Sequence, residues 1–176
     1  MQFLNHKSNY TCDLGCGQYP LMTDLSLRKG VERIDCVIYE TENDSDIHRL
    51  LSPYSKQLRT YSDSITKLNQ TEQKQYDQIL LINVLEHVQE DQKALVNIRN
   101  IMKDEGKLII SVPNRSYKSV FSEDFHNYVG HVRDGYSYDD MEKLLNKVGL
   151  EIESFFNYGV VTKDYYYEFY SNLLLE

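Results

Sequence analysis

An acidic residue followed by two closely spaced glycines is the most distinctive chemical motif of this sequence. Asp13 ends a short apolar run and is followed by Gly15 and Gly17. Glycine after a strand allows the backbone to approach a bound cofactor, because a Cβ atom would block that approach. A dinucleotide-binding loop would need a further glycine where this chain has Pro20. The loop therefore predicts a cofactor site but disfavours NAD, and the Asp13 carboxylate could hold a cationic amine instead of a pyrophosphate.

Histidines and cysteines supply the other candidates for chemistry. Cys12, Cys16 and Cys36 form an odd and sparse set, unlike the framework of a small disulfide-rich protein, so we expect reduced thiols. No metal site is expected, because the Cys12 and Cys16 spacing differs from that of a zinc knuckle and no histidine pair accompanies them. No GxSxG motif or Ser-His-Asp set is present. His87 and His131 are the candidate general bases.

Strand-like and helix-like runs alternate along the chain. This order is typical of an α/β fold with a doubly wound, mostly parallel sheet and helices on both faces. The nearly unbroken apolar run at 78–84 predicts a central strand that is covered on both faces. Ser137 with Asp140 predicts a capping box at the start of a helix. We expect strands over 11–14, 34–40, 57–61, 78–84, 107–112 and 150–156, and helices after Pro20, over 46–51, around 95–102 and over 137–149, with a turn at 105–106.

Composition favours a single soluble domain over 1–176. The hydrophobic content of 41% is ordinary for a globular protein of 176 residues. No apolar run approaches the ~20 residues that would span a membrane, so a cytoplasmic location is the default. A net charge of −8 disfavours a nucleic-acid partner. The tyrosines at 165–167 and 170 fit either a packing helix or a partner surface, and a homo- or hetero-oligomer stays open.

Four blocks of the sequence, in order, resemble the class I S-adenosylmethionine-dependent methyltransferases. These blocks are CDLGCG at 12–17, the segments 76–88 and 101–114, and the segment 130–152. The last of them is similar to a late loop and helix of members that act on small molecules. The resemblance covers roughly residues 11–157 and implies a Rossmann-like methyltransferase fold that binds S-adenosylmethionine.

The resemblance also implies roles for residues near the cofactor. Gly15 and Gly17, with the backbone of Leu14 and Cys16, would lie under the methionine part, and Asp13 would anchor its amine directly or through water. Further along the chain, Glu40 or Glu42 would bind the ribose hydroxyls, Asp63 with Ser64 would meet the adenine unless Asp63 only caps a turn, and Asn83 would line the cofactor floor.

The same resemblance places Glu86 and His87 near the reaction centre and prefers His131 as the base, with Asp124, His126 and Tyr128 as neighbouring candidates. The reaction implied is methyl transfer to an oxygen or nitrogen of a small-molecule acceptor of sugar, polysaccharide-precursor or quinone-like type.

The sequence departs from the family pattern in three places. Tyr19 stands where the family usually has a third glycine, which predicts a narrowed cofactor pocket. We expect the fold to lack the usual N-terminal helices, and also the last strand, since no clear strand follows 150–156. These departures keep a second hypothesis open, a catalytically silent binding module that completes or regulates a partner protein.

Overall fold

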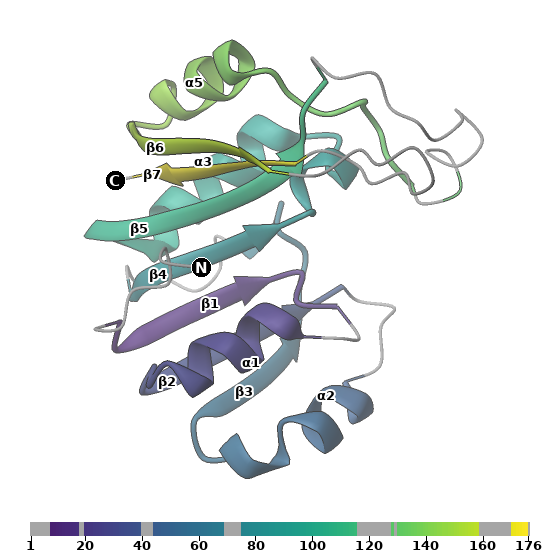
Figure 1. The fold of residues 1–176 in the computed structure, drawn as a ribbon, viewed down its shortest axis with the longest axis vertical. Coiled ribbons are helices and arrows are strands. Elements are labelled where there is room, and N and C mark those ends of the chain that lie inside the picture. The colour runs from purple at the N-terminus through teal and green to yellow at the C-terminus, as the bar shows by residue number, and fades with distance from the viewer. Residues whose placement is uncertain are drawn as a thin grey trace.

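The protein folds around one twisted sheet of seven strands. The computed structural model describes residues 8–17, 20–39, 44–68, 75–115, 128, 130–158 and 170–175. The strand order is β3-β2-β1-β4-β5-β7-β6, and the first five strands of this order are parallel (Figure 1). The strands are β1 (Tyr10–Leu14), β2 (Arg33–Ile38), β3 (Leu58–Ser62), β4 (Tyr76–Ile82), β5 (Met102–Pro113), β6 (Ile152–Tyr158) and β7 (Tyr170–Leu175).

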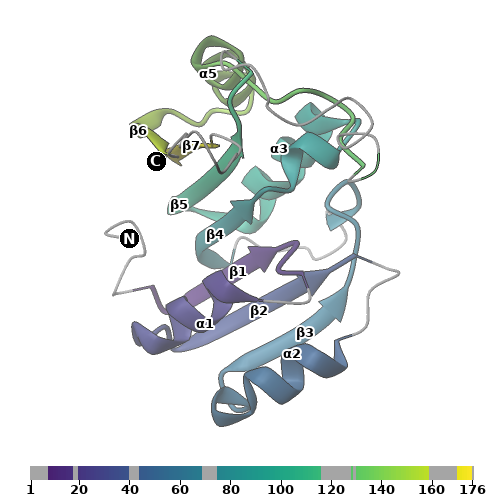
Figure 2. The same ribbon diagram turned by 45° about the vertical axis from the view of Figure 1, so that its right-hand side comes forward.

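Helices cover both faces of the sheet, as predicted (Figures 1 and 2). They are α1 (Leu21–Arg28), α2 (Ser45–Leu50), α3 (Asp91–Ile101) and α5 (Tyr138–Asn146), with short 3-10 turns η1 (Ser52–Tyr54) and η3 (Leu85–His87). Alternate residues of a strand point to opposite faces. Accordingly, Ile79 and Leu81 of β4 pack in the core that α3 and α5 cover, whereas Leu80 lies on the face of α1.

Most of the predicted elements are confirmed, including the capping box of α5. The Ser137 side chain accepts a hydrogen bond from the Asp140 backbone, and the Asp140 carboxylate accepts one from the backbone N–H of Ser137. The turn predicted at Glu105 and Gly106 is instead an irregularity inside β5, where the pairing with β4 shifts register. A Cβ atom at Gly106 would come within 2.6 Å of the Met102 side chain, so glycine allows the strand to continue through this tight place.

The expectation that the last strand is absent is wrong. β7 lies between β5 and β6 and runs antiparallel to both. Tyr170 belongs to this strand and not to a packing helix, while the tyrosines at 165–167 lie outside the described residues. The strand was missed because the polar and aromatic run before it does not alternate, and its partners are distant in sequence.

A buried carboxylate ties four parallel strands together. Asp35 of β2 is fully buried and accepts hydrogen bonds from the Tyr10 hydroxyl at 2.6 Å and the Tyr76 hydroxyl at 2.7 Å. It also pairs with the Arg59 guanidinium from β3. A buried charge is tolerated when it is paired and hydrogen-bonded in this way. Among the described residues, no helix is long and apolar enough to cross a membrane.

Candidate functional site

The carboxyl ends of the parallel strands β1, β4 and β5 lie on the right in Figure 1, and the described candidate residues come at or after the ends of parallel strands in the chain. The chain leaves β1 toward α1 on one face of the sheet and leaves the neighbouring strand β4 toward α3 on the other face. Ligands of open α/β sheets bind where neighbouring strands diverge in this way. The fold therefore points to the edge between β1 and β4 as the site.

The glycine loop after β1 has the backbone geometry that the sequence predicted. Gly15 and Gly17 both have positive φ, +76° and +63°. A Cβ atom on Gly15 would come within 2.5 Å of the Val84 side chain, so the loop packs closely against the segment that follows β4. The Gly15 N–H also donates to the Val37 carbonyl at 2.8 Å. At Gly17 a Cβ atom would meet nothing within 4 Å, so this position faces open space.

Asp13 lies behind the loop and is almost fully buried. One of its carboxylate oxygens accepts a hydrogen bond of 2.6 Å from the Thr23 hydroxyl of α1. Burial raises the pKa of Asp13 from 3.8 to about 6, although the hydrogen bonds from Thr23 act in the opposite direction. The neighbouring Leu14 is also buried and lies beside Val37 in the register of β1 and β2.

The expectation of reduced thiols is wrong for two of the three cysteines. Cys16 of the glycine loop forms a disulfide with Cys36 of β2, with the Cα atoms 5.8 Å apart. The two residues meet because β1 and β2 are parallel neighbours and the loop turns back over the end of β2, so that the Cys16 N–H reaches the Val37 carbonyl. Cys12 is free and buried. The loop is thus covalently attached to the adjacent strand.

Only some of the residues predicted for the ribose and adenine lie within the described part of the chain. Glu40, Glu42 and Tyr19 lie outside the described residues. Asp63 follows β3, and its carboxylate accepts a hydrogen bond of 2.7 Å from the backbone N–H of Ser64. This contact is local to the turn after β3, and both roles predicted for Asp63 stay predictions.

Asn83 ends β4 in a strained conformation. It has a φ of +54°, and it is the only residue other than glycine among the described ones with positive φ. Its N–H donates to the Ser111 carbonyl at 2.9 Å, and its side-chain oxygen accepts from the Ser111 hydroxyl at 3.2 Å. Asparagine tolerates this left-handed conformation better than most residues, and such strain is concentrated at functional sites.

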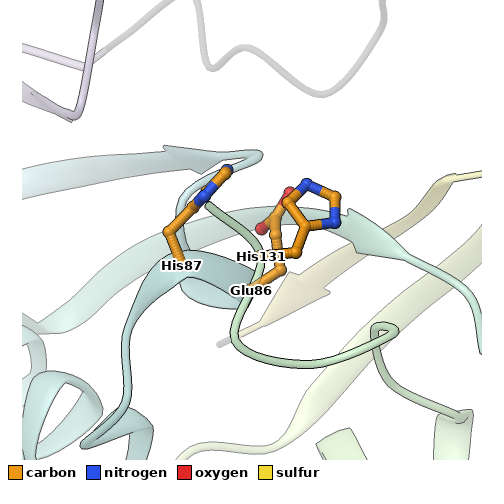
Figure 3. Close-up of side chains that lie close together, drawn as sticks. All are labelled: Glu86, His87 and His131. Carbon is orange, nitrogen blue, oxygen red and sulfur yellow. The ribbon is translucent and has the colours of Figure 1, made fainter. Parts of the chain in front are cut away.

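The two candidate bases come together, with a carboxylate beside them (Figure 3). The rings of His87 and His131 have centroids 4.7 Å apart and stand nearly perpendicular, at 78°. The His87 Nδ1 atom lies 3.1 Å from the Gly130 carbonyl oxygen. Glu86, which is buried, offers a carboxylate oxygen within 4.8 Å of a ring nitrogen of each histidine. In the sequence, His87 and His131 were two separate candidates for the base. In the structure, their rings lie side by side.

Backbone and side-chain contacts hold the His131 segment against η3 and α3. The Val132 N–H donates to the Glu86 carbonyl at 3.0 Å. The Arg133 guanidinium pairs with the Asp91 carboxylate at the start of α3 and donates to the Val88 carbonyl at 2.6 Å. The Tyr136 hydroxyl lies 3.1 Å from Asp91 as well.

Of the other loop candidates, only Tyr128 belongs to the described residues. Asp124 and His126 lie outside the described residues, and Tyr128 is 87% exposed. Arg133, Tyr136 and Asp91 were not predicted to have a role, and an arginine two residues after His131 was the only available signal.

Comparisons with known proteins show the family to which the chain belongs. Residues 2–154 match the sequence model of a family described as a methyltransferase domain. No curated protein sequence is similar enough to the chain to count as a match.

Among solved structures, similarity is in fold and not in sequence. An S-adenosylmethionine-dependent methyltransferase from Mesorhizobium loti has 11% identity and a TM-score of 0.79, over 99% of this chain and 94% of that one. The 1,6-didemethyltoxoflavin-N1-methyltransferase of Burkholderia thailandensis, solved with 1,6-didemethyltoxoflavin and S-adenosylhomocysteine, has 16% identity and a TM-score of 0.72, over 94% and 69%.

The mitomycin 7-O-methyltransferase MmcR has 18% identity and a TM-score of 0.70, over 95% of this chain but 48% of that one. This chain therefore spans about half the length of that enzyme. The resemblance inferred from the sequence is confirmed: the chain belongs to the methyltransferase domain family and is a class I methyltransferase that uses S-adenosylmethionine as its methyl donor.

Proposed function

We propose that this methyltransferase transfers the methyl group to an oxygen or nitrogen atom of a small molecule. One observation carries the proposal: the glycine loop after β1 packs against Val84, and His87, whose ring contacts that of His131, comes shortly after Val84 in the chain. Cofactor loop and candidate bases thus meet at one edge of the sheet. The structural relatives support a small acceptor, since one is named for methylation of a nitrogen of didemethyltoxoflavin and another for methylation of an oxygen of mitomycin.

The cofactor roles follow the positions along this edge. Gly15, Gly17 and the backbone of Leu14 and Cys16 would lie under the methionine part. Asp13 is buried behind the loop, so its carboxylate would bind the amine of the cofactor directly or through a water molecule. Of the remaining residues, we assign the ribose to Glu40, the adenine to Asp63 and Ser64, and the cofactor floor to Asn83.

The reaction is an in-line displacement in which the acceptor atom attacks the sulfonium methyl group. The bond from methyl carbon to sulfur breaks, its electron pair stays on sulfur, and S-adenosylhomocysteine leaves. Alignment of acceptor and methyl alone can contribute up to ~7 to 11 kcal/mol. Few catalytic side chains are needed beyond that alignment.

A hydroxyl acceptor would also have to lose a proton, and a positioned base accelerates such a step by ~10² to 10⁴-fold. We assign this role to His131 or His87. The Gly130 carbonyl can only accept a hydrogen bond, so in a neutral His87 ring the proton would sit on Nδ1, and the Nε2 lone pair would take the proton of the acceptor. The segment 130–152 favours sugar, polysaccharide-precursor or quinone-like acceptors.

The test is calorimetric titration of the wild type and two glycine variants with S-adenosylmethionine and S-adenosylhomocysteine. Gly17→Val adds a side chain where the protein itself leaves space, so apart from the strain of a side chain at positive φ it should affect only the ligand. Gly149→Val is the matched control, because Gly149 has a similar φ of +74°, also faces open space and lies at the far end of α5.

We expect micromolar binding by the wild type, wild-type affinity in Gly149→Val and a loss of at least tenfold in Gly17→Val. Failure of the wild type to bind either compound would refute the proposal for this chain. Equal affinities in the two variants would refute the placement of the cofactor. An acceptor screen with the wild type and His131→Ala then tests the base.

A further inference from the structure

Three potential metal ligands converge on one point beside the proposed cofactor loop. Glu86 and His87 come from η3, and His131 comes from the segment before α5 (Figure 3). Each offers one ligand atom, and these atoms all lie within 4.8 Å of one another. The prediction of no metal site rested on the spacing of the cysteines, and these three residues lie elsewhere in the sequence.

The hydrogen bond of His87 leaves one nitrogen of its ring for a metal ion. Because Nδ1 donates to the Gly130 carbonyl at 3.1 Å, the Nε2 lone pair is available as a ligand. Histidines that bind metals in proteins almost always donate their other ring nitrogen to a carbonyl or carboxylate, which fixes the tautomer and the ring orientation. His87 already has this arrangement.

The backbone holds the two ligand segments in register without an ion. The Glu86 carbonyl accepts a hydrogen bond from Val132, the residue after His131. Arg133 attaches the same segment to Asp91 and to the Val88 carbonyl. The distance between Glu86 and His131 is therefore set by the fold, so binding of an ion would require little rearrangement of the site.

Two imidazoles and one carboxylate are a ligand set of defined preference. Imidazole suits Zn²⁺, Fe²⁺, Ni²⁺ and Cu²⁺, whereas Ca²⁺ and Mg²⁺ prefer oxygen ligands alone. Three protein ligands also leave coordination positions open, as in catalytic zinc sites. We propose that Glu86, His87 and His131 bind one divalent first-row transition-metal ion, with open positions toward the acceptor.

The bound ion would favour acceptors with one kind of reacting group. This inference rests on the proposed function. With both imidazoles bound to the ion, neither would act as the base, and a hydroxyl oxygen bound to the ion would instead lose its proton to solvent, because the positive charge stabilises the resulting oxyanion. That oxygen then attacks the methyl carbon, and the electron pair of the breaking bond stays on sulfur. The acceptor class is therefore a small molecule with a hydroxyl group, such as a sugar or a phenol.

The experiment is titration of the full chain with Zn²⁺, after removal of any affinity tag and of bound metal by a chelator. Calorimetry should show one ion per chain. His131→Ala and Glu86→Gln should weaken binding by roughly 100-fold or more, since loss of an outer-shell partner alone costs up to that amount. Glu86 is buried, so circular dichroism is used to check that Glu86→Gln is folded. His131 is only half-buried, so His131→Ala is a second variant that disturbs the packing less.

His48→Ala is the matched control. His48 is exposed, and its Nε2 atom lies 3.3 Å from the Asp44 carboxylate, so it tests for binding by any surface pair of histidine and carboxylate. We expect this variant to bind Zn²⁺ as the wild type does. Absence of binding by the wild type, or binding that His131→Ala leaves intact, would overturn the proposed metal site.

A parallel titration with S-adenosylhomocysteine separates the two proposals. A wild type that binds S-adenosylhomocysteine but not Zn²⁺ loses the metal site and keeps the proposed function. A wild type that binds Zn²⁺ with the expected variant pattern, but not S-adenosylhomocysteine, keeps the metal site and loses the proposed function.

Discussion

Asp13 should make the protein less stable as the pH rises from about 4 to about 7. Its carboxyl group has an ordinary pKa of 3.8 and a pKa of about 6 in the folded protein, chiefly because burial disfavours the charged form. One pKa unit corresponds to about 1.4 kcal/mol, so the rise corresponds to about 3 kcal/mol. The folded state binds the proton more tightly than the unfolded state does. This contribution is therefore fully present below the unfolded pKa and is lost as the pH rises through about 6.

The comparison that isolates this contribution is wild type against Asp13→Asn. Asparagine has the same shape, does not ionise, and its carbonyl oxygen can still accept the hydrogen bond from Thr23. Urea unfolding at several pH values between 4 and 8 gives the free energy of unfolding of each protein. The wild type should lose about 2 to 3 kcal/mol relative to the variant across this range, with the midpoint of the change near pH 5, about halfway between the two pKa values, and the loss complete shortly above pH 6.

Thr23→Val provides an independent check on the physical cause. The Thr23 hydroxyl lowers the pKa of Asp13, so removal of that hydroxyl should move the midpoint to higher pH. A difference between wild type and Asp13→Asn that stays constant with pH would refute the assignment of a raised pKa to this carboxyl group.

Two further predictions concern the same loop. Gly15→Ala should lower the free energy of unfolding by about 2 to 4 kcal/mol, because alanine is unfavourable at this positive φ and its Cβ atom would clash with Val84. Gly17→Ala should lower it by only about 1 kcal/mol, the cost of the backbone conformation alone. Urea unfolding measures both losses, and equal losses would contradict the packing of the loop. The disulfide between Cys16 and Cys36 joins residues 20 positions apart, so its reduction should lower the free energy of unfolding of the wild type by about 3 kcal/mol. A Cys16→Ala, Cys36→Ala double variant should show no change with a reductant. Thermal unfolding with and without a reductant measures this, and a wild type whose stability does not change with the reductant would count against the disulfide.

Local rules predict the fold well where neighbours in sequence decide the structure. The capping box at Ser137 and Asp140 and the apolar run of β4 are both signals of this kind. The glycine loop was also predictable, because Gly15 and Gly17 are required by backbone geometry that the motif itself encodes.

Features that depend on partners distant in sequence were not predictable in the same way. The disulfide needs Cys16 to fold back over β2, which only the pairing of β1 with β2 determines. The meeting of His87 with His131 likewise depends on contacts such as the one between Glu86 and Val132. The sequence identified both histidines but contained no local pattern that joins them.

The reversed direction of β7 has a consequence for how the protein could acquire new acceptors. β6 ends and β7 begins at the edge where β5 ends, since Tyr158 and Pro113 both pair with Tyr170. The connection between β6 and β7 therefore starts and finishes at the same edge as the segments that follow β4 and β5. Under the proposed function the acceptor binds at this edge, so insertions or exchanges in these connections would alter what the enzyme accepts while leaving every strand pairing intact. Substrate preference and folding are thus separable traits in this architecture.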